Sequence, residues 1–144
     1  MLKIGKLTDY AFVILDEMSK NDGMVQSAVQ VSESVKLPEP TVSKVLKKLL
    51  KSGLLVSVRG AGGGYKTVSD VEMMSALKVI EAMEGPMNMV ACVDDANACM
   101  IRSSCSVKNR WGVLNTALRE TLDSWTLADL SGRAETHVLL KEAR

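Results

Sequence analysis

Three cysteines, Cys92, Cys99 and Cys105, carry the most reactive side chains of the chain and lie within one short, turn-rich segment. Their spacing is C-x6-C-x5-C, which lacks the closely spaced cysteine pairs that zinc sites favour. Thiolates are the ligands that hold iron–sulfur clusters in proteins. Three thiolates leave a four-ligand site one donor short. We expect a carboxylate, from elsewhere in the chain or from another subunit, rather than the sole histidine, His137, to complete it.

The residue types of the cysteine segment also fit two alternative roles. The thiols could be unliganded, or they could sense oxidation directly by forming sulfenic acid or a disulfide. The chain has an odd number of cysteines, which fits poorly with a purely structural set of disulfides.

Length and composition narrow the possible classes of protein. The chain has 144 residues, of which 47% are hydrophobic, enough for one packed domain. No apolar run reaches the roughly 18–20 residues that a membrane span needs, and residues 1–6 lack the apolar stretch of a secretory signal. We therefore expect a cytoplasmic protein without membrane contact, in which thiols stay reduced. With one histidine and no Ser/His/Asp arrangement, we expect neither an enzyme nor a small-molecule substrate.

The first half of the chain has the element order of a winged helix-turn-helix. Thr8 can cap a first helix, Ser27 opens a second, and the turn around Pro38 and Pro40 precedes a third that Gly53 closes. Two strand-like stretches, 54–58 and 65–68, flank a glycine-rich loop. The predicted fold class is mainly α with a small β-hairpin wing, followed by a long C-terminal helix.

The third helix has a split pattern that suits DNA. One face is apolar, and the other carries Ser43, Lys44, Lys47, Lys48 and Lys51. A recognition helix enters the major groove by its N-terminal end. The residues that we expect nearest a double-stranded DNA operator are therefore Pro40, Thr41, Ser43, Lys44 and Lys47. The alternative is a solvated lysine face on a helical bundle.

The glycine-rich loop is the second candidate DNA contact. Arg59 suits a narrow minor groove, where negative potential is concentrated, and Gly60 and Gly62 let the backbone approach a sugar-phosphate chain. A flexible hairpin tip without DNA contact is the alternative. A nucleotide phosphate loop is excluded, because no Gly-Lys-Ser/Thr ending and no helix follow.

The second half of the chain predicts a dimer. Ser69 and Asp70 can cap a helix that ends at Gly85 and Pro86. From Ser106 a long helix follows, with apolar residues in steps of three and four, and a seam of this length is expected to pack on a second copy. We expect a DNA-binding domain at 1–85, a cysteine-bearing loop at 86–105, a dimerisation helix at 106–130 and a polar tail at 131–144. The seam comprises Val107, Trp111, Leu114, Leu118, Leu122 and Trp125.

Four motifs together resemble those of the winged-helix iron–sulfur regulators that include IscR, NsrR and the regulators of SUF-system cluster assembly. They are KLTDYA at 6–11, VSVRGAGGGY at 56–65, EGP at 84–86 and TLADL at 126–130. The segment LPEPTVSK at 37–44 makes the chain most similar to the SUF-system regulators.

The resemblance implies a homodimer in which Cys92, Cys99 and Cys105 ligate an iron–sulfur cluster. IscR-type members have a histidine where this chain has Lys108, so another fourth ligand is needed. In the nitric-oxide-sensing relatives an aspartate of the partner subunit completes the site, and Asp9 occupies the matching position.

The expected function is a transcription regulator whose operator affinity depends on whether an iron–sulfur cluster is bound. The expected cluster is [2Fe–2S], with [4Fe–4S] as the alternative. The expected targets are the genes of SUF-type cluster assembly. A cluster-free regulator that responds to thiol oxidation or nitric oxide is one alternative, and a winged-helix module that binds protein is another. Ser43 replaces a glutamate that helps some relatives to discriminate operators, so their operator sequences do not transfer to this chain.

Overall fold

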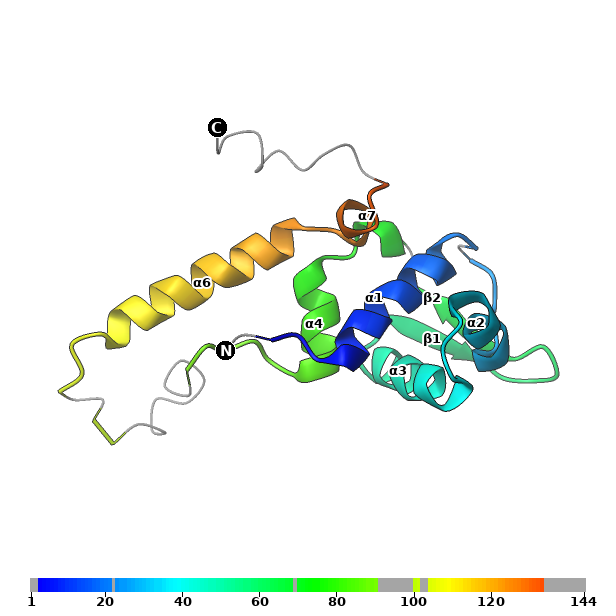
Figure 1. Cartoon of the computed structure of the whole chain (residues 1–144), viewed down its shortest axis with the longest axis horizontal. Helices are drawn as coiled ribbons and strands as arrows, with labels where there is room; N and C mark the ends of the chain where they lie inside the picture. Colours follow the sequence, from blue (N-terminus) through cyan, green and yellow to red (C-terminus); the bar gives the residue numbers. More distant parts are fainter. Residues whose placement is uncertain (1–2, 22, 69, 91–99, 102–103, 134–144) are drawn as a thin grey trace.

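The N-terminal helices pack around one core, a β-hairpin projects from one side, and a long helix extends from the other (Figure 1). The computed structural model describes residues 3–21, 23–68, 70–90, 100–101 and 104–133. This arrangement confirms the expected winged helix-turn-helix with a long C-terminal helix. The elements in chain order are α1 Lys6–Ser19, α2 Ala28–Val35, α3 Glu39–Lys51, β1 Leu55–Val58, β2 Gly64–Thr67, η1 Val71–Met73, α4 Ala76–Glu84, α6 Lys108–Ser124 and α7 Leu127–Leu130.

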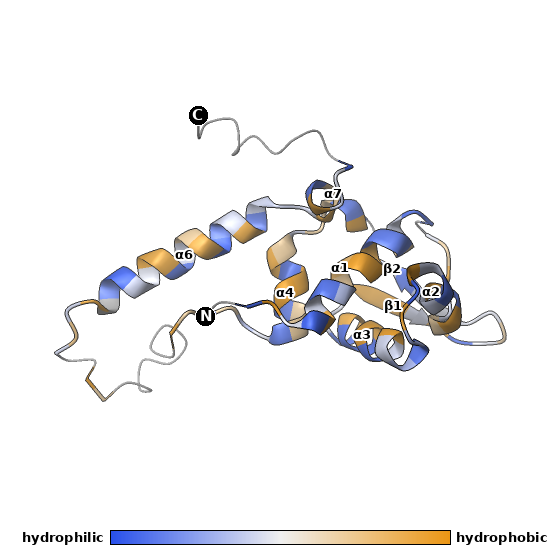
Figure 2. Ribbon diagram, in the orientation of Figure 1, coloured by the Kyte–Doolittle hydropathy of each residue, from blue (hydrophilic) through white to orange (hydrophobic). Residues whose placement is uncertain are grey.

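The core forms where the apolar stripes of α1 and α3 meet. The stripe of α3 recurs every three or four residues, as an amphipathic helix requires, and its members are fully buried. Figure 2 shows these apolar faces turned toward each other and the polar faces turned outward. The core therefore orients α3, the helix with the expected DNA contacts. Its main members from the two helices are Ala11, Ile14, Leu15 and Met18 with Val42, Val45, Leu46 and Leu49.

The wing is a two-stranded antiparallel hairpin that is fixed at its base. Leu55 pairs with Thr67 and Val58 with Gly64. A further bridge joins Tyr65 to Gln26, just before α2. A Cβ at Gly64 would collide with the backbone carbonyl of Gln26, so this close approach requires glycine.

Two expected helix starts are wrong. Helix α1 begins at Lys6, and Thr8 is buried within its first turn, where its hydroxyl donates a hydrogen bond to the carboxylate of Glu84. The next α-helix begins at Ala76 and is capped by Ser75. Asp70 adopts a left-handed conformation, with φ of 58°, and precedes only the short η1. Ser69, the other expected cap, lies outside the described residues.

The C-terminal end of α6 is tied to the core through α7. The Ala76 amide donates to the Trp125 carbonyl at 2.7 Å, and the Leu127 amide donates to the Met74 carbonyl at 2.9 Å. Leu127 itself is buried in the core. Helix α6 starts at Lys108, two residues after the expected Ser106, and its N-terminal end points away from the core (Figure 1). None of the helices in the described ranges is long and apolar enough to cross a membrane.

Candidate nucleic-acid interface and cysteine segment

The N-terminal end of α3 presents most of the expected DNA contacts. Pro40 lies in the first turn, where its missing amide hydrogen costs nothing. Pro40, Lys44 and Lys47 are exposed, and Thr41 and Ser43 are partly buried. The Ser43 hydroxyl donates to the Glu39 carboxylate at 2.6 Å, so it must exchange this partner to donate to a phosphate or to a base acceptor, whereas its oxygen remains able to accept.

Lys48 differs from the solvated lysine that the sequence pattern predicts. Its ammonium group donates a hydrogen bond of 2.6 Å to the backbone carbonyl of Met83, near the end of α4. The lysine face of α3 therefore divides into two parts. All four lysines are exposed as whole residues, but the ammonium group of Lys48 joins α3 to α4.

The wing loop holds its expected DNA contacts at an exposed tip. Arg59, Gly60 and Gly62 are all exposed. Gly60 has φ of 116°, a conformation that L side chains rarely adopt, and its carbonyl accepts a hydrogen bond from the Gly63 amide at 3.0 Å. The tight turn thus explains why glycine stands at position 60. In Figure 1 the wing tip and the N-terminal end of α3 lie toward the end of the molecule opposite α6.

The expected cluster ligands are only partly described. Cys92 and Cys99 lie outside the described residues. Cys105 is a partly buried free thiol just before α6, and Asp9 is exposed near the start of α1. Figure 1 shows the start of α6 far from α1, so one protomer does not bring Cys105 and Asp9 together. Within the described ranges, no three His, Cys, Asp or Glu side chains gather as a metal site.

Asp9 lies on an apolar groove between α1, α4 and the end of α6. The groove has a volume of about 980 Å³, and its wall includes Phe12, Val13, Ile80 and Leu122. Val13 is 45% exposed on this surface. The carboxylate of Asp9 accepts no hydrogen bond from any residue that the structure describes. The Asp9 carboxylate, which can serve as an oxygen ligand, therefore lies at the edge of an open apolar surface without a hydrogen bond from the described residues.

Polar side chains hold the start of the cysteine segment between α4 and α6. The Glu81 carboxylate accepts hydrogen bonds from Arg119 and from the Met87 amide. The Met89 amide donates to Asn115, which is 4% exposed although it lies on the otherwise open α6. The Arg119 guanidinium, followed by the Met87 amide, lowers the pKa of Glu81 below its usual value.

Sequence reasoning missed these residues, but a signal for them existed. Asn115 and Arg119 are four residues apart, so they share one face of α6. Their polar partners on α4 and at residues 87–89 are visible only in the fold.

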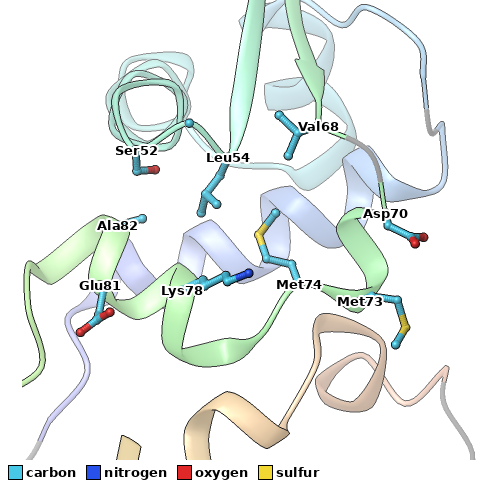
Figure 3. Close-up of a pocket in the computed structure, with 10 residues that line it drawn as sticks. Ser52, Leu54, Val68, Asp70, Met73, Met74, Lys78, Glu81 and Ala82 are labelled. Carbon is cyan, nitrogen blue, oxygen red and sulfur yellow. The ribbon is translucent and has the colours of Figure 1, made fainter.

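A second hollow places the end of α3 beside α4. It has a volume of about 730 Å³, and Ser52, Leu54, Met74, Lys78 and Ala82 are part of its wall. Figure 3 shows the Lys78 side chain directed into this hollow beside Met74, with Ser52 and Ala82 facing each other at its edge. The last turns of α3 and α4 are therefore neighbours.

Comparison with known proteins agrees with this geometry. The NsrR transcription regulator of Bacillus subtilis is 31% identical over 134 residues, which cover 90% of each chain. The solved structure of CymR, the global cysteine regulator of B. subtilis, has a TM-score of 0.68 and 30% identity, and it covers 94% of this chain and 100% of CymR. The structure of T. potens IscR has a TM-score of 0.63 and 27% identity, covering 93% of this chain and 89% of IscR.

The fold and these relatives define a winged-helix, DNA-binding transcription regulator. Residues 4–133 match the Rrf2 model, described as an iron-dependent transcriptional regulator. The chain belongs to the Rrf2 family. The expected family is thereby confirmed, but the relatives do not establish a particular closeness to the SUF-system regulators.

Proposed function

We propose that the chain is a homodimeric transcription regulator whose operator affinity is set by an iron–sulfur cluster, and that it controls SUF-type cluster-assembly genes. The ligands are Cys92, Cys99 and Cys105 of one protomer and Asp9 of the partner subunit. The observation that carries the proposal is the position of Asp9 at the edge of an open apolar groove, apart from Cys105 of its own chain.

The donor set suits an iron–sulfur cluster. Thiolates supply the soft ligands, and Cys105 is a free thiol. Asp9 supplies one hard oxygen donor, which is displaced more easily than a thiolate. When bound, the cluster would supply iron chemistry that reacts with nitric oxide and oxidants, and its presence would depend on the supply of iron. We expect a [2Fe–2S] cluster, with [4Fe–4S] as the alternative.

A second copy accounts for the two uncovered apolar surfaces. Leu114 on α6 is 49% exposed, and Val107, just before α6, is 46% exposed. The groove beside α1 provides a complementary apolar surface of the same chain. If α6 of the partner covers this groove, its N-terminal end carries Cys105 toward Asp9. Residues 106–130 would then form the dimer interface, and residues 86–105 the cluster loop.

Cluster ligation by the cysteine segment would control DNA binding by changing the relative position of the two DNA-binding domains of the dimer. A dimer must present its two recognition helices about 34 Å apart to match one turn of DNA. Residues 87–89 are bonded to both α4 and α6, so ligation of the adjacent cysteines can alter the relative position of the two DNA-binding domains, residues 1–85. The tail, 131–144, lies mostly outside the described residues and has no assigned part.

The cluster is tested by iron and acid-labile sulfide analysis, with an absorbance spectrum, on protein purified without oxygen. We expect matched iron and sulfide and visible charge-transfer bands. Asp9→Ala should alter the spectrum and shorten the lifetime of the cluster, whereas Glu33→Ala, which removes an exposed carboxylate of α2, should not. A D9A protein with an unchanged spectrum and lifetime would exclude Asp9 as a ligand.

The DNA contacts are tested by the salt dependence of binding. Lys44→Met and Arg59→Met should each weaken operator binding and reduce the slope of log affinity against log salt by about one, because each removes one positive charge from the DNA interface. Lys78→Met, an exposed lysine on α4, is the matched control. Equal slopes for all three variants would contradict the assigned interface.

A cluster-free thiol sensor is the second candidate. It is favoured by the similarity to CymR, whose solved structure is described as a global cysteine regulator. In that case the protein would be free of iron after anaerobic purification, and peroxide would change its operator affinity. The Cys105→Ser variant would abolish that response.

A further inference from the structure

Lys48 forms a contact that neither DNA binding nor cluster ligation requires. It lies on the recognition helix, but its ammonium group donates to the Met83 carbonyl at 2.6 Å. Figure 3 shows the end of α3 beside the last turn of α4, where Ser52 faces Ala82. The contact therefore spans two helices at the place where they already pack.

The Met83 carbonyl is a favourable acceptor for a lysine. The last four carbonyls of a helix have no partner within it, and Met83 is the second-last residue of α4. The negative end of the helix dipole lies there, so a cation is stabilised. Lys48 thus serves as a C-terminal cap for α4 that is donated by α3.

The same turn of α4 is the base of the cysteine segment. The Glu84 carboxylate accepts hydrogen bonds from the Thr8 hydroxyl and from the Gly5 amide, in the first turn of α1 and just before it. Thr8 is the neighbour of Asp9. Gly85 follows with φ of 94° and directs the chain toward the cysteines. One helical turn therefore contacts α1 beside the proposed ligand, the cysteine segment and α3.

We propose that Lys48 is a positioning residue that couples the base of the cysteine segment to the recognition helix, through its hydrogen bond to the Met83 carbonyl. The regulatory part of this inference rests on the proposed function. A displacement of the turn at residues 83–85 moves the acceptor, and Lys48 transmits that displacement to α3. Lys44 and Lys47 contact DNA, whereas Lys48 sets how α3 is presented.

The first test compares operator affinity of cluster-loaded and cluster-free protein in four chains: wild type, Lys48→Met, Lys48→Arg and Lys47→Met. A regulatory coupling typically changes affinity by roughly 5–150-fold. We expect K48M to reduce the ratio between the two forms to within about twofold, and K48R, which keeps a donor, to restore most of it. K47M should weaken both forms equally and leave the ratio unchanged. A K48M protein with the wild-type ratio overturns the proposal.

The second test needs no cluster and separates this proposal from the proposed function. Gly85→Ala forces a side chain into a left-handed conformation and so perturbs the base of the cysteine segment. Amide hydrogen exchange of α3 is measured in cluster-free protein with G85A, K48M and both changes. We expect G85A to raise exchange in α3 in the wild-type background and to have little further effect in the K48M background.

Equal effects of G85A in both backgrounds would overturn the coupling through Lys48, whatever the cluster does. If the affinities of loaded and cluster-free wild type are equal but the G85A effect depends on Lys48, the proposed function fails and the mechanical link stands. Thermal unfolding of each variant verifies that the fold is retained. We expect the Lys48 variants to retain it, because Lys48 is an exposed residue outside the core.

Discussion

The winged-helix half of the molecule and helix α6 place their apolar residues in opposite environments. In α3 the stripe of Val42, Val45, Leu46 and Leu49 is fully buried by the chain's own helices. Among the side chains of α6 that the structure describes, the most buried is the polar Asn115, while large apolar residues such as Leu114 are open to solvent. Figure 2 shows these apolar residues along a helix that extends free of the core. The first half completes its own core, and the second half has an open apolar surface that the proposed partner subunit would cover.

The connection between the two regions is polar. Glu81, Arg119 and Asn115 hold α6 and the start of the cysteine segment against α4. Such contacts depend on geometry and contribute less free energy than apolar burial. They are therefore more sensitive to a small displacement of one partner than apolar packing is.

The largest expected effect is the loss of a core side chain in the winged-helix half. Leu46→Ala leaves a cavity beneath α3, and the free energy of unfolding should fall by about 2–5 kcal/mol. Chemical denaturation monitored by circular dichroism measures it. Val29→Ala, which alters a residue that is 55% exposed on α2, should change it by no more than about 0.5 kcal/mol. Similar losses for both variants would contradict the described core.

A charged substitution in the apolar seam of α6 should disrupt the dimer rather than the fold of each protomer. Leu114→Asp places a charge in the proposed dimer interface, where its desolvation is unfavourable, so the dimer should dissociate while helix content persists. Analytical ultracentrifugation measures the state of association. Thr116→Asp, two residues along and therefore on the opposite face of α6, should remain dimeric. Monomeric wild type, or dimeric L114D, would refute the assignment of the interface.

A smaller effect is expected where the chain leaves α7. The Arg133 guanidinium donates to Asp16, Ser19 and Glu72. Arg133→Met should lower the free energy of unfolding by about 1 kcal/mol, since these groups are partly exposed and screened by solvent. Arg110→Met, an exposed residue of α6, is the control for loss of charge. An unchanged denaturation midpoint for R133M would show that the network adds no stability.

The smallest effect is a pH dependence at the polar connection. Arg119 and the Met87 amide hold the pKa of Glu81 below its usual value of 4.5. The group thus contributes stability above about pH 4.5, which is lost as the pH falls through its lower folded value. Glu81→Gln should remove this part of the acid transition and cost a fraction of 1 kcal/mol, about 0.2–1, at neutral pH. Glu120→Gln, also on the surface, should keep the wild-type pH profile.

The sequence predicted local features well and long-range partners poorly. The stripe of α3, the cap at Ser27 and the glycine-rich hairpin follow from spacing and residue type. Thr8 and Lys48 have the residue types of a helix cap and a solvated lysine. Their partners, Glu84 and Met83, are distant in the chain, and only packing of α4 against α1 and α3 brings them close. The proposed site, in which Asp9 would meet the cysteines of a second chain, cannot be placed by spacing within one sequence.

The central claim, a cluster site shared between two protomers, is tested most directly with mixed dimers. Asp9→Ala protein and Cys105→Ser protein are co-expressed with different affinity tags, and the mixed dimer is purified without oxygen for iron and sulfide analysis. If Asp9 acts on the partner's cysteines, the mixed dimer contains one intact site, and we expect about half of the wild-type cluster content. Each homodimeric variant should have a strongly reduced content. A mixed dimer with no more cluster than the two homodimers would contradict the shared site.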